Sequence, residues 1–197
     1  MSKRKWHLLV GLLSLAFFCY IFLRISKDFK NFNYETLKSG DFIFTRGKSI
    51  QSFAVLLFDR NTTNYSHCGT VCIENNTCYI IHSTPTPIGN QKGGVVMEPL
   101  DEFFKSNAVT LASVFRFKNE ENEHINAALV VLKNYLHDSI LFDDEFVLTN
   151  NKLYCTELLW KAFLATGINL GEKHDLDKII FPSDLIQSNY LEPIYTY

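Results

Sequence analysis

Apolar and polar positions along the chain follow two patterns, one typical of β-strands and one typical of helices. Short apolar or alternating runs between turn residues predict strands over 42–44, 67–74, 77–83, 95–99 and 108–117. Apolar positions three and four residues apart, or an opening proline, predict helices over 49–60, 100–106, 119–136 and 153–167. Because the strands gather in the first part of the folded region, we expect an α+β fold in which a small, mostly antiparallel sheet packs against helices.

A β-hairpin is expected where the runs 67–74 and 77–83 meet, because Asn75–Asn76 between them is a typical two-residue turn. Counting outward from this turn places His82 opposite Gly69 and diagonal to His67. A register shifted by two residues would place the two histidines directly opposite each other. In either register the two imidazoles share a face of the hairpin, with their Cβ atoms about 5–8 Å apart.

The neighbours His67 and Cys68 point to opposite faces of the predicted strand, so this pair is not expected to act as a dyad. Cys68 and Cys72 are separated by about 13 Å along a strand, too far to bind one zinc ion together. We therefore expect no metal site, and we expect Cys68, Cys72 and Cys78 to be small core residues.

Cys155 lies in the first turn of a predicted helix, in the run LYCTELLW. Free backbone amides and the helix dipole favour a thiolate at this position, and the backbone amide of Cys155 is a candidate donor to an oxyanion. Tyr154 and Gln51 are candidates for a second donor. Glu157 is either a surface acid or an orienting group. From these residues alone, a simply buried Cys155 and structural roles for His67 remain open.

Residues 6–23 form a long stretch without a charged side chain, flanked on both sides by Lys and Arg. At helical rise this stretch covers about 27 Å, close to the thickness of a bilayer's hydrocarbon core. A cleaved signal peptide needs small residues at its cleavage site, and Phe17 and Phe18 do not suit a lipoprotein signal at Cys19. An uncleaved membrane anchor fits best, and a buried core helix is the alternative.

We therefore expect an N-terminal transmembrane helix and its basic flank in residues 1–30, a connector in 31–36, and a folded domain in 37–197. Basic residues are equally frequent on both sides of the span, so they do not decide its orientation. The position of the span at the start of the chain, like that of an export signal, favours a single-pass protein with its domain on the periplasmic or extracellular side.

Charge and cysteine content narrow the possible functions. Six of the 19 Lys and Arg residues but only one of the 21 acids lie in residues 1–33, so the predicted domain is acidic. It offers no basic stripe to nucleic acid, and we expect no nucleic-acid partner. The five cysteines are odd in number and include no C-x-x-C pair, which does not indicate a disulfide framework.

Six segments taken in order carry a resemblance to a known family: LKSGDFIFTRG, NYSHCGTV, YIIHSTP, MEPLDEFF, LYCTELLWKAF and FPSDLIQSNYLEPIY. The chain resembles the YaeF/YiiX family of permuted papain-like amidases, within the NlpC-type superfamily, over about residues 37 to 195. In this chain the histidine motif precedes the cysteine motif, as the permuted branch requires. The resemblance implies a circularly permuted papain-like fold.

The resemblance also implies roles for individual residues. Cys155 matches the nucleophile of the Y-C-[ST]-E-L motif, and His67 matches the general base of S-H-x-G. The third, orienting position falls on His82, where the family often has an acid. Another permuted branch, similar to lecithin:retinol acyltransferase, has histidine at this place.

The expected function is that of a membrane-anchored cysteine hydrolase. It would cleave an amide or ester bond in a cell-envelope peptide or a lipid-like substrate through a Cys-His-His triad and a thioester, without a cofactor. Transfer of the acyl group to another acceptor is possible chemistry for the same site. The alternative from another class is a non-catalytic papain-like module that binds an acyl or peptidyl ligand. The sequence predicts no particular oligomeric state.

Overall fold

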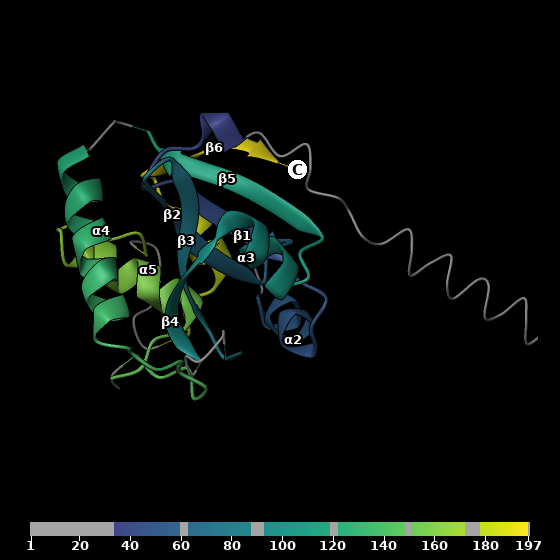
Figure 1. The fold of residues 1–197 in the computed structure, drawn as a ribbon. Helices are drawn as coiled ribbons and strands as arrows, with labels where there is room; N and C mark the ends of the chain where they lie inside the picture. Colours follow the sequence, from purple (N-terminus) through teal and green to yellow (C-terminus); the bar gives the residue numbers. More distant parts are fainter. Residues whose placement is uncertain are drawn as a thin grey trace, which may run out of the picture. The chain divides into compact units, whose positions relative to one another are not determined.

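A six-stranded antiparallel sheet forms the centre of the described residues (Figure 1). The computed structural model describes residues 34–59, 63–87, 93–118, 122–148, 151–171 and 178–196, all within one compact unit. The strand order is β4-β3-β2-β1-β5-β6. The strands are β1 (Phe42–Arg46), β2 (His67–Glu74), β3 (Thr77–Thr84), β4 (Gly94–Pro99), β5 (Leu111–Phe117) and β6 (Leu191–Thr196).

The helices confirm the predicted α+β layout. They are α2 (Ile50–Phe58), α3 (Leu100–Ser106), α4 (Asn122–His137), α5 (Cys155–Leu164) and α6 (Pro182–Ile186), with a 3₁₀ turn η2 at Tyr34–Thr36. Strand β6 was not predicted. Its run contains Pro193, which cannot donate to a ladder and is tolerated because β6 is an edge strand paired only with β5.

The hairpin β2–β3 has the first of the two predicted registers. Both residues of the Asn75–Asn76 loop have left-handed φ angles, 48° and 61°, as a type I′ turn requires. The ladder pairs Thr70 with Ile81, which places His82 opposite Gly69. The two-residue turn therefore fixes which side chains stand beside each other at the far end of the hairpin.

Strand alternation divides the sheet into two buried faces. One face carries Phe42, Phe44 and Cys68 and packs against α4 and α5, with the rings of Phe42 and Phe163 5.0 Å apart. The other face carries the two histidines and is covered by α3, whose Phe103 is fully buried. In Figure 1, α4 and α5 accordingly lie together on one side of β2–β4, and α3 lies on the other.

The prediction of an N-terminal transmembrane helix is contradicted. A helix that crosses a bilayer needs about 20 mostly apolar residues. No helix in the described ranges has that length and apolar character, since the longest of them, α4, has 16 residues and carries charged side chains. This finding also corrects the expected single-pass location with an exported domain. Residues 6–23, which carry that prediction, lie outside the described residues.

Gly69 is expected to be intolerant of a side chain, because β2 and β3 approach closely there. A Cβ atom at this position would overlap with Cγ2 of Ile80 and lie 3.1 Å from Cβ of His82. Overpacking of this kind costs about 1–3 kcal/mol. Gly69→Ala should therefore lower the free energy of unfolding by that amount, measured by urea denaturation. In an Ile80→Ala background the cost should shrink, and an equal cost in both backgrounds would contradict the proposed clash.

Candidate active site

Three side chains from three neighbouring strands form a row on the α3-covered face. Nε2 of His67 lies 2.9 Å from Nδ1 of His82, and Nε2 of His82 lies 2.9 Å from Oε1 of Glu98. His82 is fully buried and Glu98 is 4% exposed, while His67 is half-buried. The prediction that the two imidazoles share a face of the hairpin is confirmed.

Glu98 is the member of this row that the sequence reasoning missed. In the structure β3 and β4 are adjacent, and His82 pairs with Val96. Glu98 stands two positions beyond Val96, and side chains two apart on a strand share a face. The pairing of β3 with β4 was the missing information.

The chemistry of Glu98 orders the protons along the row. A carboxylate only accepts hydrogen bonds, so the hydrogen between His82 and Glu98 belongs to Nε2 of His82. Burial, with a smaller contribution from His67, lowers the pKa of His82 to about 4 against the opposing effect of Glu98. His82 is therefore neutral at neutral pH, and its Nδ1 accepts a hydrogen bond from Nε2 of His67. This leaves Nδ1 of His67 as the nitrogen that can take a proton.

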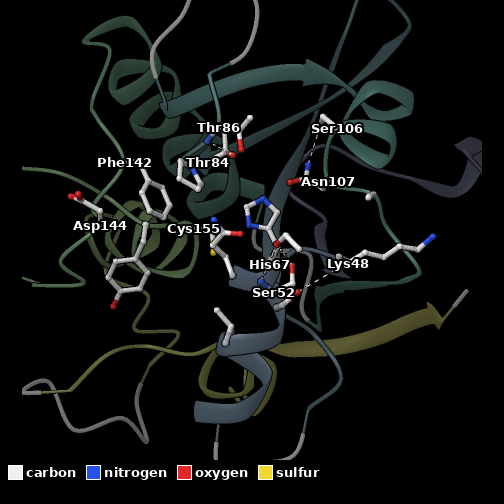
Figure 2. Close-up of a pocket in the computed structure, with 18 of the residues that line it drawn as sticks. Lys48, Ser52, His67, Thr84, Thr86, Ser106, Asn107, Phe142, Asp144 and Cys155 are labelled. Carbon is white, nitrogen blue, oxygen red and sulfur yellow. Dashed lines mark hydrogen bonds between the residues drawn. The ribbon is translucent and has the colours of Figure 1, made fainter.

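Cys155 is the first residue of α5 and stands beside His67 at the cavity (Figure 2). Its pKa is lowered well below the ordinary value of a thiol. The largest cause is a hydrogen bond from the Cys68 thiol, which burial opposes, and the charge of His67 and its hydrogen bond lower the pKa further. The position at a helix start, the neighbouring imidazole and the thiol donor together favour a thiolate at Cys155.

The expected separation of Cys68 from the site requires a correction. Cys68 does point to the opposite face of β2 from His67 and is fully buried in the core, as predicted. It nevertheless reaches Cys155, because the start of α5 lies against the start of β2 and contacts two consecutive residues of that strand. Burial, then Cys155, raises the pKa of Cys68, so Cys68 is the donor of the pair.

The remaining cysteines of the domain have the opposite character. Burial raises the pKa of Cys72, and it raises that of Cys78 to about 11. All four described cysteines are free thiols. Cys155 is thus distinguished from the others by the groups around its sulfur rather than by exposure.

The three supporting candidates lie in different surroundings. The Tyr154 hydroxyl accepts a hydrogen bond from the Ile180 amide at 3.0 Å, and burial raises its pKa. Gln51 is exposed on α2 and lines the cavity. Glu157 is fully buried rather than a surface acid, and it accepts from the Tyr154 amide and pairs with Lys161 at 2.8 Å. Glu157 therefore stabilises the start of α5, and Gln51 alone has a side chain open to a bound substrate.

The cavity at Cys155 has a volume of about 610 Å³. Its wall combines hydroxyl and amide side chains from four segments with the ring of Phe142 (Figure 2) and that of Phe146. Helix α2, which forms one side, exposes most of its apolar residues, including Phe53 at 67%. Among the described ranges, no group of three or more His, Cys, Asp or Glu side chains is arranged to hold a metal ion.

A family model described as permuted papain-like amidase enzyme, YaeF/YiiX, C92 family, matches residues 36–194. The chain belongs to this family. The resemblance inferred from the motifs is confirmed, and the antiparallel sheet packed against helices fits the papain-like fold. Membership of the YaeF/YiiX family implies papain-like cysteine amidase or peptidase chemistry.

Relatives from Escherichia coli agree with membership of the YaeF/YiiX family. "Uncharacterized protein YiiX" of strain K12 is 27% identical over 157 residues, which are 79% of this chain and 72% of that protein. A crystal structure described as that of metalloprotein yiiX from strain O157:H7 superposes with a TM-score of 0.66 at 21% identity. The superposition covers 81% of this chain and 97% of that chain, and at this identity it shows the fold alone.

Removing the thiol donor beside Cys155 should make Cys155 a weaker acid. Cys68→Ala removes the hydrogen bond that lowers the pKa of Cys155, so the thiolate should be lost at a higher pH than in the unmodified protein. At neutral pH, alkylation of Cys155 by iodoacetamide, followed by peptide mass spectrometry, should slow roughly tenfold, as expected for loss of a hydrogen bond to a charged group.

Cys68→Ser is the matched control, because a hydroxyl keeps the donor in place. Its alkylation curve against pH should stay close to that of the unmodified protein. Equal curves for the Ala and Ser variants would show that the hydrogen bond from residue 68 does not set the acidity of Cys155.

Proposed function

We propose that this chain is a cysteine hydrolase that cleaves an amide or ester bond in a peptide or lipid-like substrate through Cys155, His67 and His82. The observation that carries the proposal is the thiol of Cys155 at the start of α5, in contact with an imidazole that a second imidazole holds at 2.9 Å. Membership of a papain-like amidase family supports the same chemistry.

The first half of the reaction forms a thioester. Nδ1 of His67 holds the proton from Cys155, since Nε2 is engaged by His82. The thiolate sulfur attacks the carbonyl carbon, a C–S bond forms, and the π electrons move to the carbonyl oxygen. As the tetrahedral adduct collapses, the C–N or C–O bond breaks, and the leaving amine or alcohol takes the proton from His67.

The second half releases the acid and restores the thiol. A water molecule gives a proton to Nδ1 of His67 while its oxygen attacks the thioester carbon. The C–S bond then breaks, the acid product leaves, and Cys155 and His67 return to their starting state. An alcohol or amine in place of water gives acyl transfer by the same steps.

The developing oxyanion is assigned to the backbone amide of Cys155 at the start of α5 and to the side-chain amide of Gln51 on α2. The amide of Cys155 is at the first helical position, where amides have no partner within the helix. Gln51 is the candidate for a second donor because its exposed side chain lines the cavity. Tyr154 is less suited, since its hydroxyl is buried and bonded to Ile180.

Mass spectrometry of lipid and peptidoglycan extracts tests the proposed activity directly. Extracts incubated with the unmodified chain should gain cleavage products. With Cys155→Ala these products should form at a rate at least roughly a thousandfold lower. Cys78→Ala, which changes a half-buried thiol remote from the cavity, is the matched control and should leave the products unchanged.

Two outcomes would overturn the proposal. Products formed equally by Cys155→Ala would assign the cleavage to other residues. An intact lipid or peptide retained by both proteins, with no product from either, would favour the non-catalytic binding module over the hydrolase.

A further inference from the structure

We propose that Glu98 is a positioning residue of the Cys155 site, acting on His67 through His82. This inference rests on the proposed function, in which His67 exchanges protons with Cys155. Glu98 would hold the hydrogen of His82 on Nε2, so that Nδ1 of His82 accepts from His67 and fixes the tilt and tautomer of the base. It would also supply the negative charge that a neutral His82 lacks.

The geometry supports a continuous path from the carboxylate to the sulfur. Oε1 of Glu98 lies 2.9 Å from Nε2 of His82, and the opposite nitrogen of that ring lies 2.9 Å from His67. His67 in turn contacts Cys155. His82 uses its two nitrogens for two different partners, so a change of tautomer at His82 would alter its hydrogen bond to His67 as well.

The surroundings of Glu98 suit a fixed acceptor. Its side chain is nearly buried, and the hydroxyl of Ser106, at the end of α3, donates to the same Oε1 at 2.9 Å. The two donors converge on one oxygen and hold the side chain of Glu98 in a single orientation. Ser106 thereby ties the carboxylate of β4 to the helix that covers the histidines.

Phe103 shields the hydrogen bonds among His67, His82 and Glu98 from water. Its ring stacks on His67 with a centroid separation of 5.7 Å and stands edge-on to His82 at 4.9 Å. Buried hydrogen bonds to a charged group are stronger than those exposed to water. The Glu98 charge should therefore act on His67 more strongly than it would through the same two hydrogen bonds exposed to water.

The position of the acid explains why a histidine can occupy the third place. A carboxylate at position 82 would stand directly against the base, because His82 itself contacts His67. In this chain the acid stands one residue further out, on β4, and His82 bridges the gap. An acid at position 82 should then make Glu98 unnecessary, and this gives the test.

The test measures alkylation of Cys155 by iodoacetamide at neutral pH, with the full chain and peptide mass spectrometry as the readout. Glu98→Gln keeps the size of the side chain but removes its charge, and it should slow the reaction roughly tenfold to a hundredfold. Glu102→Gln, an exposed acid of α3 paired with Lys105, is the matched control and should react like the unmodified chain.

A His82→Glu background separates positioning from a structural role. There, residue 82 faces His67 with its own carboxylate, and Glu98 adds only a like charge beside it, so Glu98→Gln should leave the rate unchanged or raise it. An equal loss of rate from Glu98→Gln in both backgrounds, or no loss in the unmodified background, would overturn the proposal.

Nitrogen-15 NMR of the histidine rings provides a readout that needs no variant. In the unmodified chain His82 should carry its hydrogen on Nε2 at neutral pH. A hydrogen on Nδ1 instead would refute the inference even if Glu98→Gln failed to fold. Because neither measurement uses a hydrolysable substrate, the positioning role can stand while the proposed hydrolase fails, or the reverse.

Discussion

The hydrogen bond between His67 and His82 is the interaction on which the candidate site depends, and the register of one hairpin sets it. The two-residue Asn75–Asn76 turn fixes that register, because a slip by one residue would send one of the rings to the opposite face of the sheet. Gly69 stands opposite His82 and has no side chain, so nothing at this position crowds His82. The backbone geometry of the turn therefore determines which side chains of the site become neighbours.

The second constraint is the packing of α5 across the opposite face of the same strands. It places Cys155 at the start of β2, where both His67 and Cys68 reach the sulfur. One sheet thus separates two environments, a dry row of hydrogen bonds under α3 and an apolar core under α4 and α5. The Cys155 thiol lies at the boundary, where it contacts the proton acceptor His67 from one face and the hydrogen-bond donor Cys68 from the other.

Local patterns predicted most of the fold. Alternation identified β2 and β3, and helical spacing identified α2, α4 and α5. The turn left two registers open, of which the first is correct, and it placed the two histidines on one face. Two features depended on tertiary pairing and were missed: Glu98 came into place only through the pairing of β3 with β4, and Cys68 only through the docking of α5. The membrane prediction rested on the apolar run at residues 6–23, whereas no helix in the described ranges is long and apolar enough to cross a bilayer.

The central claim is that the neighbours of Cys155 lower the pKa of its thiol well below the ordinary value. Ultraviolet absorbance of thiolates, titrated for the unmodified chain and for Cys155→Ala, tests it most directly. The difference between the two curves should show one thiolate already formed at neutral pH, well below the ordinary pKa of a thiol. A difference that develops only at alkaline pH, together with the other cysteines, would contradict the account.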